Sequence, residues 1–482
     1  MSSVRTSLAY AFLNANAITA LQFFSSLILA RLLSPSEFGV YSTAAVFVGI
    51  AQLLREFGVA SYVVQAKSIT TDLLRAAFTL LLMLAWSIGL ILALLSSSIA
   101  EFYREPAARD IVLVLALNFF VTPLGAVTMA VAQRNMRFRA IALIGIAGTI
   151  VGTVATIFLA MQGYGPISLA WGAVAGTVAT FVCTLPLRTA EMSWWPTLHG
   201  LKPLLRFGGT VTSSNVLGYV NRSASDIMLG RLINMDAVGL FNRAASMNRY
   251  FTSALNGVLA PVMLPWLSQL NRAGTSLEDI YEKITERITG LSWPVYAVIA
   301  LLSDPLIHVL FGDQWRSSAG LVPFICMAAM VSVPYTASGA LFLAKGKPAN
   351  NLLSEAINLP IKVIAILVAA PYGLYAVAVA WPFVALAGAA VQQILLSRVL
   401  KVRLMDSGRY LGKSALVTLV VVLATWSGLQ TLANEAASII KLVVGGGISF
   451  VVWAATLKLL KHPLYEELLR LVQQLKSRLA PD

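Results

Sequence analysis

A pattern of residues near the N-terminus recurs 200 residues later. Residues 30–45 read ARLLSPSEFGVYSTAA, and residues 230–245 read GRLINMDAVGLFNRAA. The arginine, a leucine, the glycine and the closing Ala-Ala keep their places without a gap, and Tyr41 becomes Phe241. This spacing is far longer than the roughly 20–50 residues of a solenoid repeat. It predicts two homologous membrane halves around a central path, the arrangement of many transporters.

The composition indicates a membrane protein. Of 482 residues, 58% are hydrophobic and 12% are charged, with a mean hydropathy of +0.78. A soluble domain has about 45–50% apolar and about 25% charged residues. A helical span requires roughly 20 apolar residues, and about fourteen such runs are present. They lie near residues 8–30, 40–62, 76–98, 111–132, 141–161, 166–187, 208–231, 238–262, 289–311, 319–343, 352–370, 374–397, 411–432 and 439–461. We therefore predict an all-α polytopic membrane protein of about 14 transmembrane helices.

Further pairs of matching residues extend the repeat over both halves. Pro123 and Pro334 occupy the fourth and tenth predicted spans, and Tyr164 and Tyr372, each followed by glycine, precede the sixth and twelfth. Because six spans is an even number, both halves begin on one face, and the repeat is parallel. The predicted parts are an N-terminal lobe over 1–200, a C-terminal lobe over 201–400, two added helices over 401–461, and a cytoplasmic amphipathic tail over 462–482.

Basic residues are unevenly distributed between the spans. With a cytoplasmic N-terminus, the cytoplasmic gaps hold clusters such as Arg134, Arg137 and Arg139. The outer loops hold only Arg31, Arg104, Arg109, Arg231 and Arg316. Cytoplasmic loops carry an excess of Lys and Arg, so both termini are predicted to be cytoplasmic. The net charge of +14 then indicates contact with anionic membrane lipids and not with nucleic acid.

Two stretches outside the spans have the periodicity of surface helices. Ser276 and Asp279 have the spacing of a capping box, which predicts an amphipathic helix within 264–287 that enters span nine along the cytoplasmic surface. A leucine stripe runs along the tail and predicts an interfacial helix, with docking to a partner as the alternative. Its members are Leu464, Leu468, Leu471, Leu475 and Leu479.

The sequence has no pattern that is typical of an enzyme, a metal site or a cofactor site. Cys183 and Cys326 fall inside predicted spans, and the three histidines are scattered without metal-ligand spacing. Residues 408–414 read GRYLGKS, but a phosphate loop requires four residues between its glycines and a preceding strand. No nucleophile–base pair is evident. We therefore predict a non-enzymatic protein without metal or cofactor.

Charged residues inside the predicted spans have a basic excess. Such residues are costly in a bilayer and usually face a polar cavity. The basic ones are Arg55, Arg222, Arg243, Arg249 and Lys362, and the acidic ones are Glu56, Asp226 and Glu355. This excess predicts a cavity that receives a polar or anionic head group.

Polar stripes along spans seven and eight locate the predicted cavity. Residues three and four apart share a helical face. Span eight has the stripe Asn242, Ser246, Arg249, Ser253 and Asn256, and span seven has Thr212, Asn215, Tyr219, Arg222 and Asp226. With Arg55 and Lys362 added, these positions are the candidate substrate-binding residues, apart from Thr212. Arg249 is central and has no acidic neighbour at helical spacing, so it is the leading candidate ligand for a diphosphate.

Structural alternatives remain open for several of these charges. Arg222 and Asp226 are four residues apart and can neutralise each other. Arg55 and Glu56 can form a pair that stabilises a lobe. Arg243 is close enough to the outer end of its span to extend to the lipid head groups, as is Arg231. Polar stripes in membrane helices are also common packing faces.

The ordered motifs carry a family resemblance over nearly the whole chain. They are LARLL at 29–33, EFGVY at 37–41, REFG at 55–58, QRNMRFR at 133–139, DIMLGR at 226–231, GLFNRA at 239–244 and LFGDQW at 310–315. The chain resembles polysaccharide flippases of the multidrug/oligosaccharidyl-lipid/polysaccharide exporter superfamily, in the lipopolysaccharide and exopolysaccharide branch. The resemblance implies a polyprenyl-diphosphate-linked oligosaccharide moved from the cytoplasmic to the periplasmic leaflet by alternating access, with the polysaccharide polymerase machinery as a candidate partner.

Three alternatives to this function stay open. A cation-coupled multidrug exporter of the same superfamily is expected to have twelve spans and acidic residues in its lobes, which the basic excess does not favour. A lipid II flippase differs in the sugar that it carries. A non-transporting scaffold or polymerase of polysaccharide synthesis is the third; a polymerase would be expected to have a large periplasmic loop. The sequence does not identify the glycan, the coupling ion or the oligomeric state.

Overall fold

The computed structural model describes residues 2–66, 68–189, 192, 195–197, 201–400, 404–432 and 437–479, and every regular element in these ranges is helical. Ten helices are long and apolar enough to cross a membrane, and the number rises to 12 if each of two bent helix pairs is one span. Each predicted apolar run falls on one helix or on consecutive helical segments. The prediction of an all-α polytopic membrane protein is therefore confirmed.

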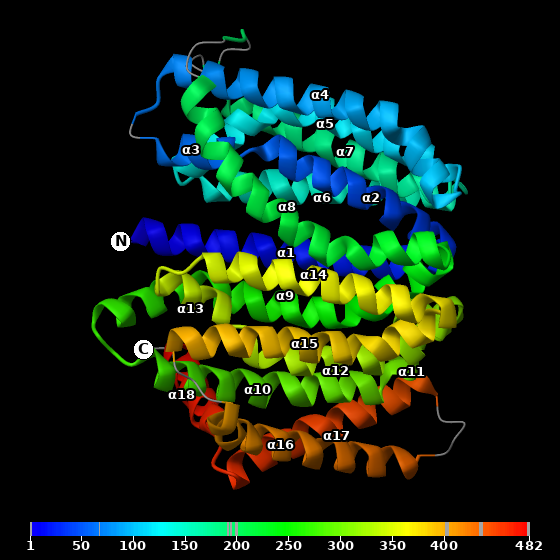
Figure 1. Ribbon diagram of the computed structural model, residues 1–482, viewed down its shortest axis with the longest axis vertical. Coiled ribbons are helices and arrows are strands. Elements are labelled where there is room, and N and C mark those ends of the chain that lie inside the picture. The colour runs from blue at the N-terminus through cyan, green and yellow to red at the C-terminus, as the bar shows by residue number, and fades with distance from the viewer. Residues whose placement is uncertain are drawn as a thin grey trace. The chain divides into compact units, whose positions relative to one another are not determined.

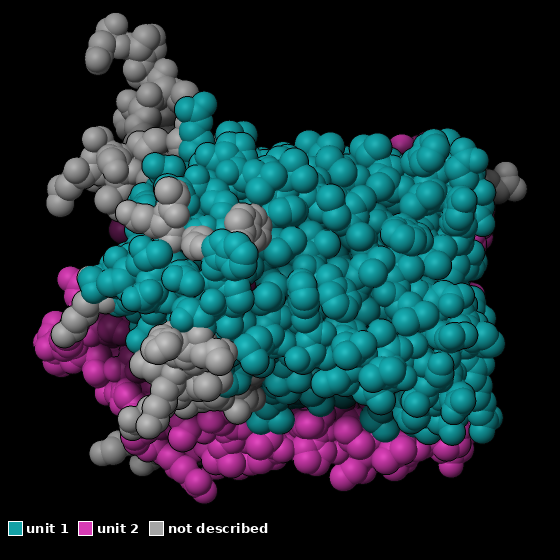
Figure 2. Space-filling view, turned by 90° about the horizontal axis from the view of Figure 1, so that it is seen from above, with its two compact units in different colours: residues 1–239 teal, residues 240–482 magenta. Residues whose placement is uncertain are grey.

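The chain forms two compact units, Met1–Gly239 and Leu240–Asp482, coloured separately in Figure 2. The elements up to the boundary are α1 Ser2–Leu32, α2 Pro35–Glu56, α3 Val59–Gln65, α4 Thr71–Tyr103, α5 Ala107–Arg134, α6 Phe138–Met161, α7 Ile167–Thr184, η1 Leu185–Leu187 and α8 Leu201–Leu232. The predicted lobes are defined by the sequence repeat and divide at residue 200, whereas the two units are defined by contacts between helices and divide at residue 239. These units do not test the lobes, which stay a prediction.

The second unit contains nearly all of α9, Met235–Arg272. The elements after it are α10 Leu277–Leu301, α11 Ser303–Phe311, η2 Asp313–Leu321, α12 Val322–Ser332, η3 Val333–Tyr335, α13 Ser338–Ala344, α14 Ala349–Ala369, η4 Ala370–Tyr372, α15 Leu374–Leu400, α16 Leu404–Gln430, α17 Ser438–Leu459 and α18 Pro463–Leu479. Helix α10 packs against α12 and α16, and α15 packs against α12 and α14. Figure 1 shows the helices of this unit running across the picture, roughly along one direction. Helices α9, α10, α12, α14 and α15 line the candidate site.

The first unit has its core along α5. Helix α5 packs against α2, α4 and α7, and its buried side chains Ile111, Leu115 and Phe119 lie in one apolar cluster with Val40 and Val48 of α2. In Figure 1 these helices run side by side. Burial on several sides makes α5 the central helix of this unit.

The two copies of the sequence repeat form helix N-termini of the same kind. Ser34 caps α2 and forms a full capping box with Glu37. Two hundred residues later, the Asn234 side chain accepts a hydrogen bond from the Ala237 N–H at 2.8 Å in the first turn of α9. Ser and Asn side chains cap helices by satisfying N–H groups that have no partner within the first turn. Equivalent positions of the repeat therefore start equivalent helices.

The repeated glycines lie against the opposite copy of the motif. A Cβ atom added to Gly39 would lie well inside 3.0 Å of the Met235 carbonyl oxygen, and one added to Gly239 would lie equally close to the Pro35 carbonyl oxygen. The first turns of α2 and α9 therefore meet backbone to backbone, with no room for a side chain. The two copies meet at the same end of their helices, as a parallel repeat requires.

The predicted helix within 264–287 begins where the sequence places it, and it continues into span nine. Helix α10 begins at Leu277, with Ser276 at its N-cap, and runs into span nine until a 75° bend separates it from α11, whereas the start of the region belongs to α9, which continues to Arg272. The predicted capping box does not form, because the Ser276 hydroxyl hydrogen-bonds Glu278 at 2.9 Å and makes no cap hydrogen bond to the first turn of α10. Extensions of transmembrane helices beyond their apolar runs thus account for the pattern.

The start of the tail is fixed to the second unit by a buried histidine. His462 is fully buried, and its Nδ1 accepts a hydrogen bond from the Leu464 N–H at 3.2 Å. The proton is therefore on Nε2, which donates to the Ser414 Oγ at 3.2 Å. That hydroxyl also accepts from Thr289 at 2.9 Å. Beside this network, Arg287 forms an ion pair with Glu467 of α18. The first turns of the predicted amphipathic tail therefore dock on α10 and α16.

We expect acid to weaken this docking. Burial, with the nearby cations Lys413 of α16 and Arg287 of α10, lowers the pKa of His462 to about 4. Between that value and about 6.5 the undocked state binds more protons, so docking strengthens as the pH rises and weakens as it falls. About 3 kcal/mol is lost over this window. This loss is measured as a decrease in the hydrogen-exchange protection factors of the α18 amides between pH 7 and pH 4, which correct for the pH dependence of the intrinsic exchange rate.

A His462→Gln variant is the control for this experiment, because it keeps a polar side chain that does not titrate. The protection factors of α18 in this variant should change much less with pH than those of the wild type. Equal pH dependence in the two proteins would exclude His462 as the titrating group.

Candidate functional site

A cavity of about 480 Å³ opens within the second unit. Its walls come from α9, α10, α12, η3, α14 and α15. Polar lining residues on four of these helices are Asn248, Thr252, Asn256, Tyr296, Ser332 and Lys362, and Thr336 follows η3. Among the described residues that line the cavity, none is acidic. The cavity therefore offers amides, hydroxyls and one ammonium group.

Helix α9 supplies one polar edge of the cavity. Asn248, Thr252 and Asn256 are spaced four residues apart and share a face of the helix. The Thr252 hydroxyl is 2.8 Å from the Tyr296 hydroxyl of α10 and 2.9 Å from the Asn248 Oδ1. These contacts join α9 to α10 and orient the hydroxyl groups at the cavity wall.

An aromatic and a cation from two other helices define a further wall. The Lys362 ammonium of α14 lies 5.7 Å from the ring centre of Trp381 on α15. The Trp381 ring meets Phe241 edge to face, with a centroid distance of 5.1 Å. A cation within about 6 Å of an indole face is attracted by the ring. The pair therefore presents a positive charge and an indole ring beside the same cavity.

Two residues of the predicted stripe of α9 interact with each other. Arg249 is exposed and donates to the Asn242 Oδ1 at 3.3 Å and to the Asn242 carbonyl oxygen at 3.2 Å. Ser246 is buried and donates to the Arg243 carbonyl oxygen at 2.6 Å. Ser253 and Asn256 are exposed, and of the predicted stripe Asn256 lines the cavity. The stripe and the cavity edge are thus neighbouring faces of one helix that share Asn256.

The predicted site residues of the first unit lie on α2 and α8. Tyr219 is half-buried, and its hydroxyl lies where a Cβ at Gly49 would be, so it packs closely on α2. Arg222 is exposed and Asp226 is half-buried. The ion pairs of the described residues do not join these two. The side chain of Asn215, like that of Thr212, lies outside the described residues.

Arg55 forms the pair that the sequence offered as an alternative. Its guanidinium is 3.6 Å from the Glu56 carboxylate, at the C-terminus of α2, and the Arg55 side chain is 12% exposed. Adjacent residues of a helix do not face each other, so the pair is loose.

Arg243 does not extend to the membrane surface as predicted. It is 6% exposed, and its guanidinium lies 4.3 Å from the ring centres of both Phe311 and Trp315. Both rings are fully buried, at the corner between α11 and η2 where Gly312 has a φ of +95°. A planar guanidinium stacks on aromatic faces. Two of the motifs in the family resemblance, GLFNRA and LFGDQW, therefore form one contact.

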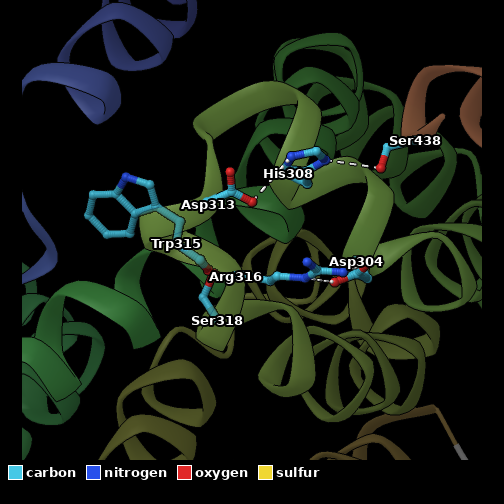
Figure 3. Close-up of polar contacts among 7 residues, drawn as sticks. All are labelled: Asp304, His308, Asp313, Trp315, Arg316, Ser318 and Ser438. Atoms are coloured by element: carbon cyan, nitrogen blue, oxygen red, sulfur yellow. Dashed lines mark hydrogen bonds and ion pairs between the residues drawn. The ribbon is translucent and has the colours of Figure 1, made fainter.

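Polar contacts hold the same corner from its other side (Figure 3). His308 of α11 lies between Asp313, with 3.2 Å from Nε2 to Oδ1, and Ser438 of α17, with 3.0 Å from Nδ1 to Oγ. Arg316 donates two hydrogen bonds to the Asp304 carboxylate, at 2.9 and 3.3 Å. These contacts tie the α11–η2 corner to α17.

Most residues that line the cavity were not among the predicted site residues. Lys362 and Asn256 were predicted, whereas Trp381, Tyr296, Asn248 and Thr252 were not. The regular four-residue spacing of Asn248, Thr252 and Asn256 was an available signal. The aromatic residues gave none, because a tryptophan or tyrosine in an apolar span has the same local pattern when it faces lipid.

Comparisons with known proteins place the chain among polysaccharide biosynthesis proteins. The sequence model of a family described as "Polysaccharide biosynthesis protein" matches residues 28–320. The chain is 22% identical over 330 residues to the lipopolysaccharide biosynthesis protein WzxC of Escherichia coli, covering 66% of this chain and 65% of that protein. It is 20% identical over 343 residues to the teichuronic acid biosynthesis protein TuaB of Bacillus subtilis, covering 68% and 69%.

A third relative has transport in its name. The succinoglycan biosynthesis transport protein ExoT of Rhizobium meliloti is 23% identical over 340 residues, covering 69% of this chain and 67% of that protein. The chain thus spans about two thirds of the length of the curated relatives that it matches.

Solved structures of low sequence identity share the fold. The lipid II flippase MurJ, in an inward closed conformation, superposes with a TM-score of 0.76 at 14% identity, over 92% of this chain and 99% of that one. An inward-facing multidrug resistance MATE family transporter of the MOP superfamily gives 0.57 at 16% identity, over 81% and 96%. At these identities the two structures show that the chain shares their fold.

Proposed function

This chain belongs to the family of polysaccharide biosynthesis proteins, and on that premise we propose that it is a flippase for a polyprenyl-diphosphate-linked oligosaccharide. It is a multi-pass membrane transport protein of bacterial polysaccharide biosynthesis. In the proposed reaction the lipid-linked oligosaccharide moves by alternating access from the cytoplasmic to the periplasmic leaflet of the inner membrane. The product then supplies lipopolysaccharide or exopolysaccharide assembly.

The chemistry of the cavity in the second unit is the observation that carries this proposal. It combines hydroxyl and amide groups with the Lys362 ammonium, and none of its described lining residues is acidic. A carrier of cationic drugs requires acidic groups to bind its cargo, whereas a glycan requires hydrogen-bonding groups. The polar head group needs such a cavity, and its apolar tail can stay in lipid.

Arg249 is the proposed ligand of the diphosphate. Its guanidinium is exposed, and Asn242 holds it through two oxygen atoms. A guanidinium binds phosphate oxygens with paired, charge-assisted hydrogen bonds. Ser253 and Asn256, which are also exposed on α9, are proposed to contact the same head group, and Arg222 of α8 stays a separate candidate ligand. Outward movement of the anion follows an inside-negative potential, which contributes about 2.3 kcal/mol per charge per 100 mV.

Loss of Arg249 is expected to block transport without unfolding the protein. Arg249→Ala removes the guanidinium from an exposed position, so at least a 100-fold slower translocation is expected, about 2.7 kcal/mol. Arg249→Lys should be partly active, because it keeps the charge but not the planar pair of donors. The measurement is translocation of polyprenyl-diphosphate oligosaccharide in proteoliposomes, with cytoplasmic-face accumulation in cells at matched membrane levels.

Arg272→Ala is the matched control, since Arg272 is an exposed cation at the C-terminus of the same helix. Wild-type translocation by Arg249→Ala would exclude Arg249 as an essential ligand. Normal glycan export after deletion of the gene, in a cell without a redundant flippase, would contradict the flippase proposal itself. Transport of lipid II in place of the oligosaccharide would identify the alternative cargo.

The orientation is proposed from the distribution of basic residues. With both termini cytoplasmic, reporter fusions at Gly165, Asp313 and Glu435 should indicate the periplasm. Fusions at Lys345 and Lys202 should indicate the cytoplasm. A periplasmic C-terminus would refute this orientation.

A further inference from the structure

We infer that an apolar groove between α9, α10 and α18 binds one membrane phospholipid with a zwitterionic head group, phosphatidylethanolamine. The inference places an acyl chain in the groove, the phosphate on Arg287 and the ammonium group on Glu467. This groove is not the cavity proposed for the transported head group, and the inference does not depend on the proposed function.

The groove is built from three helices of the second unit and has a volume of about 460 Å³. Helix α9 contributes Leu259 to its lining, α10 contributes Ile288, and α18 contributes Leu464. Among the described residues that line it, Arg287 and Glu467 are the charged ones, and the others are aliphatic or aromatic. Burial of apolar surface therefore dominates the binding of any ligand here.

The groove extends from the predicted membrane interior to the level of the lipid head groups. Leu255 and Leu291 line it and belong to predicted spans eight and nine. Arg287 comes just before span nine, and Glu467 follows the last predicted span. A lipid has its apolar chain and its polar head group in the same order along the membrane normal. The groove thus matches an amphiphile along its length.

The two charged residues pair with each other and still have groups for a ligand. The Arg287 Nε faces the Glu467 carboxylate, and an Nη1 hydrogen of Arg287 is donated to the Lys283 carbonyl oxygen at 3.3 Å. A guanidinium has more N–H groups, and a carboxylate more lone pairs, than these contacts use. The two side chains are 37% and 51% exposed. A ligand can therefore reach both charges while the pair stays intact.

A paired cation and anion select a zwitterionic head group. A phosphate binds a guanidinium through paired, charge-assisted hydrogen bonds. A primary ammonium group donates hydrogen bonds to a carboxylate, whereas the trimethylated ammonium of phosphatidylcholine has no N–H to donate. The anionic phosphatidylglycerol matches Arg287 and is repelled by Glu467. Phosphatidylethanolamine is therefore expected to bind more tightly than either of the other two lipids.

Quenching of tryptophan fluorescence by brominated lipids tests this order. Trp266 lines the groove and is 42% exposed. The full-length protein in detergent is titrated with the three lipids, each with the same brominated acyl chains. The signal of Trp266 is the difference between the wild type and Trp266→Phe. Phosphatidylethanolamine should reach half-quenching at an about fivefold lower mole fraction than the other two, which corresponds to about 1 kcal/mol.

Three variants locate the preference for the head group. Glu467→Gln should bind phosphatidylethanolamine and phosphatidylglycerol alike, and Arg287→Gln should bind phosphatidylethanolamine more weakly. Glu466→Gln is the matched control, because Glu466 is the neighbouring carboxylate, pairs with Arg470 at 4.0 Å and does not line the groove. Hydrogen exchange of α18 checks that the tail stays docked in each variant. The comparison of head groups in the wild type holds even where a variant releases α18.

Equal quenching of Trp266 by the three lipids in the wild type would overturn the inference, as would an undiminished preference in Glu467→Gln. Leu255 also lines the cavity proposed for the substrate, so a carrier lipid is the competing occupant. Relief of quenching by a polyprenyl phosphate, and not by unbrominated phosphatidylethanolamine, would assign the groove to that carrier and refute the inference. The soluble head group, glycerophosphoethanolamine, should not relieve quenching, because it has no acyl chain. The assay requires no transport, so its result is separate from that of the flippase proposal.

Discussion

Gly39→Ala and Gly239→Ala are each expected to destabilise the protein by about 3 kcal/mol, an overpacking cost at the upper end of the usual range. In both variants the added methyl group would meet a backbone carbonyl oxygen, of Met235 or of Pro35. A backbone atom cannot rotate away as a side chain can, so the first turns of α2 and α9 must separate. The measurement is the unfolding temperature in detergent, together with the yield of folded protein.

Gly257→Ala is the matched control for these variants. Gly257 is also within α9, and none of the described residues has an atom within 4 Å of a Cβ built on it. Alanine is the better helix former by about 0.8–1.0 kcal/mol, so this variant should be as stable as the wild type or slightly more. An unfolding temperature of Gly39→Ala equal to that of Gly257→Ala would refute the close contact.

Arg243→Ala is expected to lower the free energy of unfolding by about 3 kcal/mol. A desolvated cation–π contact contributes about 2 kcal/mol or more, and removal of a buried side chain adds the loss of packing. Arg243 contacts two rings, Phe311 and Trp315, so its loss should loosen the α11–η2 corner. Arg243→Lys should lie between Ala and wild type, because an ammonium cannot stack as a plane.

Thermal unfolding and hydrogen exchange of residues 303–321 measure this effect. Arg231→Ala is the control, since Arg231 is exposed and faces one ring, Phe102, at 5.4 Å. A contact of that kind contributes about 0.5–1 kcal/mol. If Arg243→Ala loses no more stability than Arg231→Ala, the burial of Arg243 between the two rings does not stabilise the corner.

The helices could be predicted from the sequence because a span must pair its own backbone N–H and C=O groups in hydrogen bonds and must be apolar along its full length. Those two demands leave a strong local signal. Boundaries outside the bilayer have no such signal. Ser276 had the spacing of a capping box, yet its hydroxyl binds Glu278 and the residues after it continue into span nine. The spacing therefore located the start of this helix but not the partner of the Ser276 hydroxyl.

The environment of a side chain within a span was harder to predict, because lipid is as apolar as the protein core. Arg243 was expected to extend to the head groups, but two aromatic rings enclose it. Those rings are more than 60 residues away in sequence, and no local pattern connects them. Lys362 was identified because a charge in a span is rare, whereas Trp381 beside it was not.

The reciprocal glycine contact has a consequence for how the two glycine variants combine. Gly39 touches residue 235, and Gly239 touches residue 35, so each contact maps onto the other when 200 is added or subtracted. Residue i touching j while j touches i is the geometry that an isologous interface has between identical subunits, and here it occurs within a single polypeptide. Substitution of either glycine disturbs the same contact, so the destabilisation by the two substitutions together is not the sum of their separate effects.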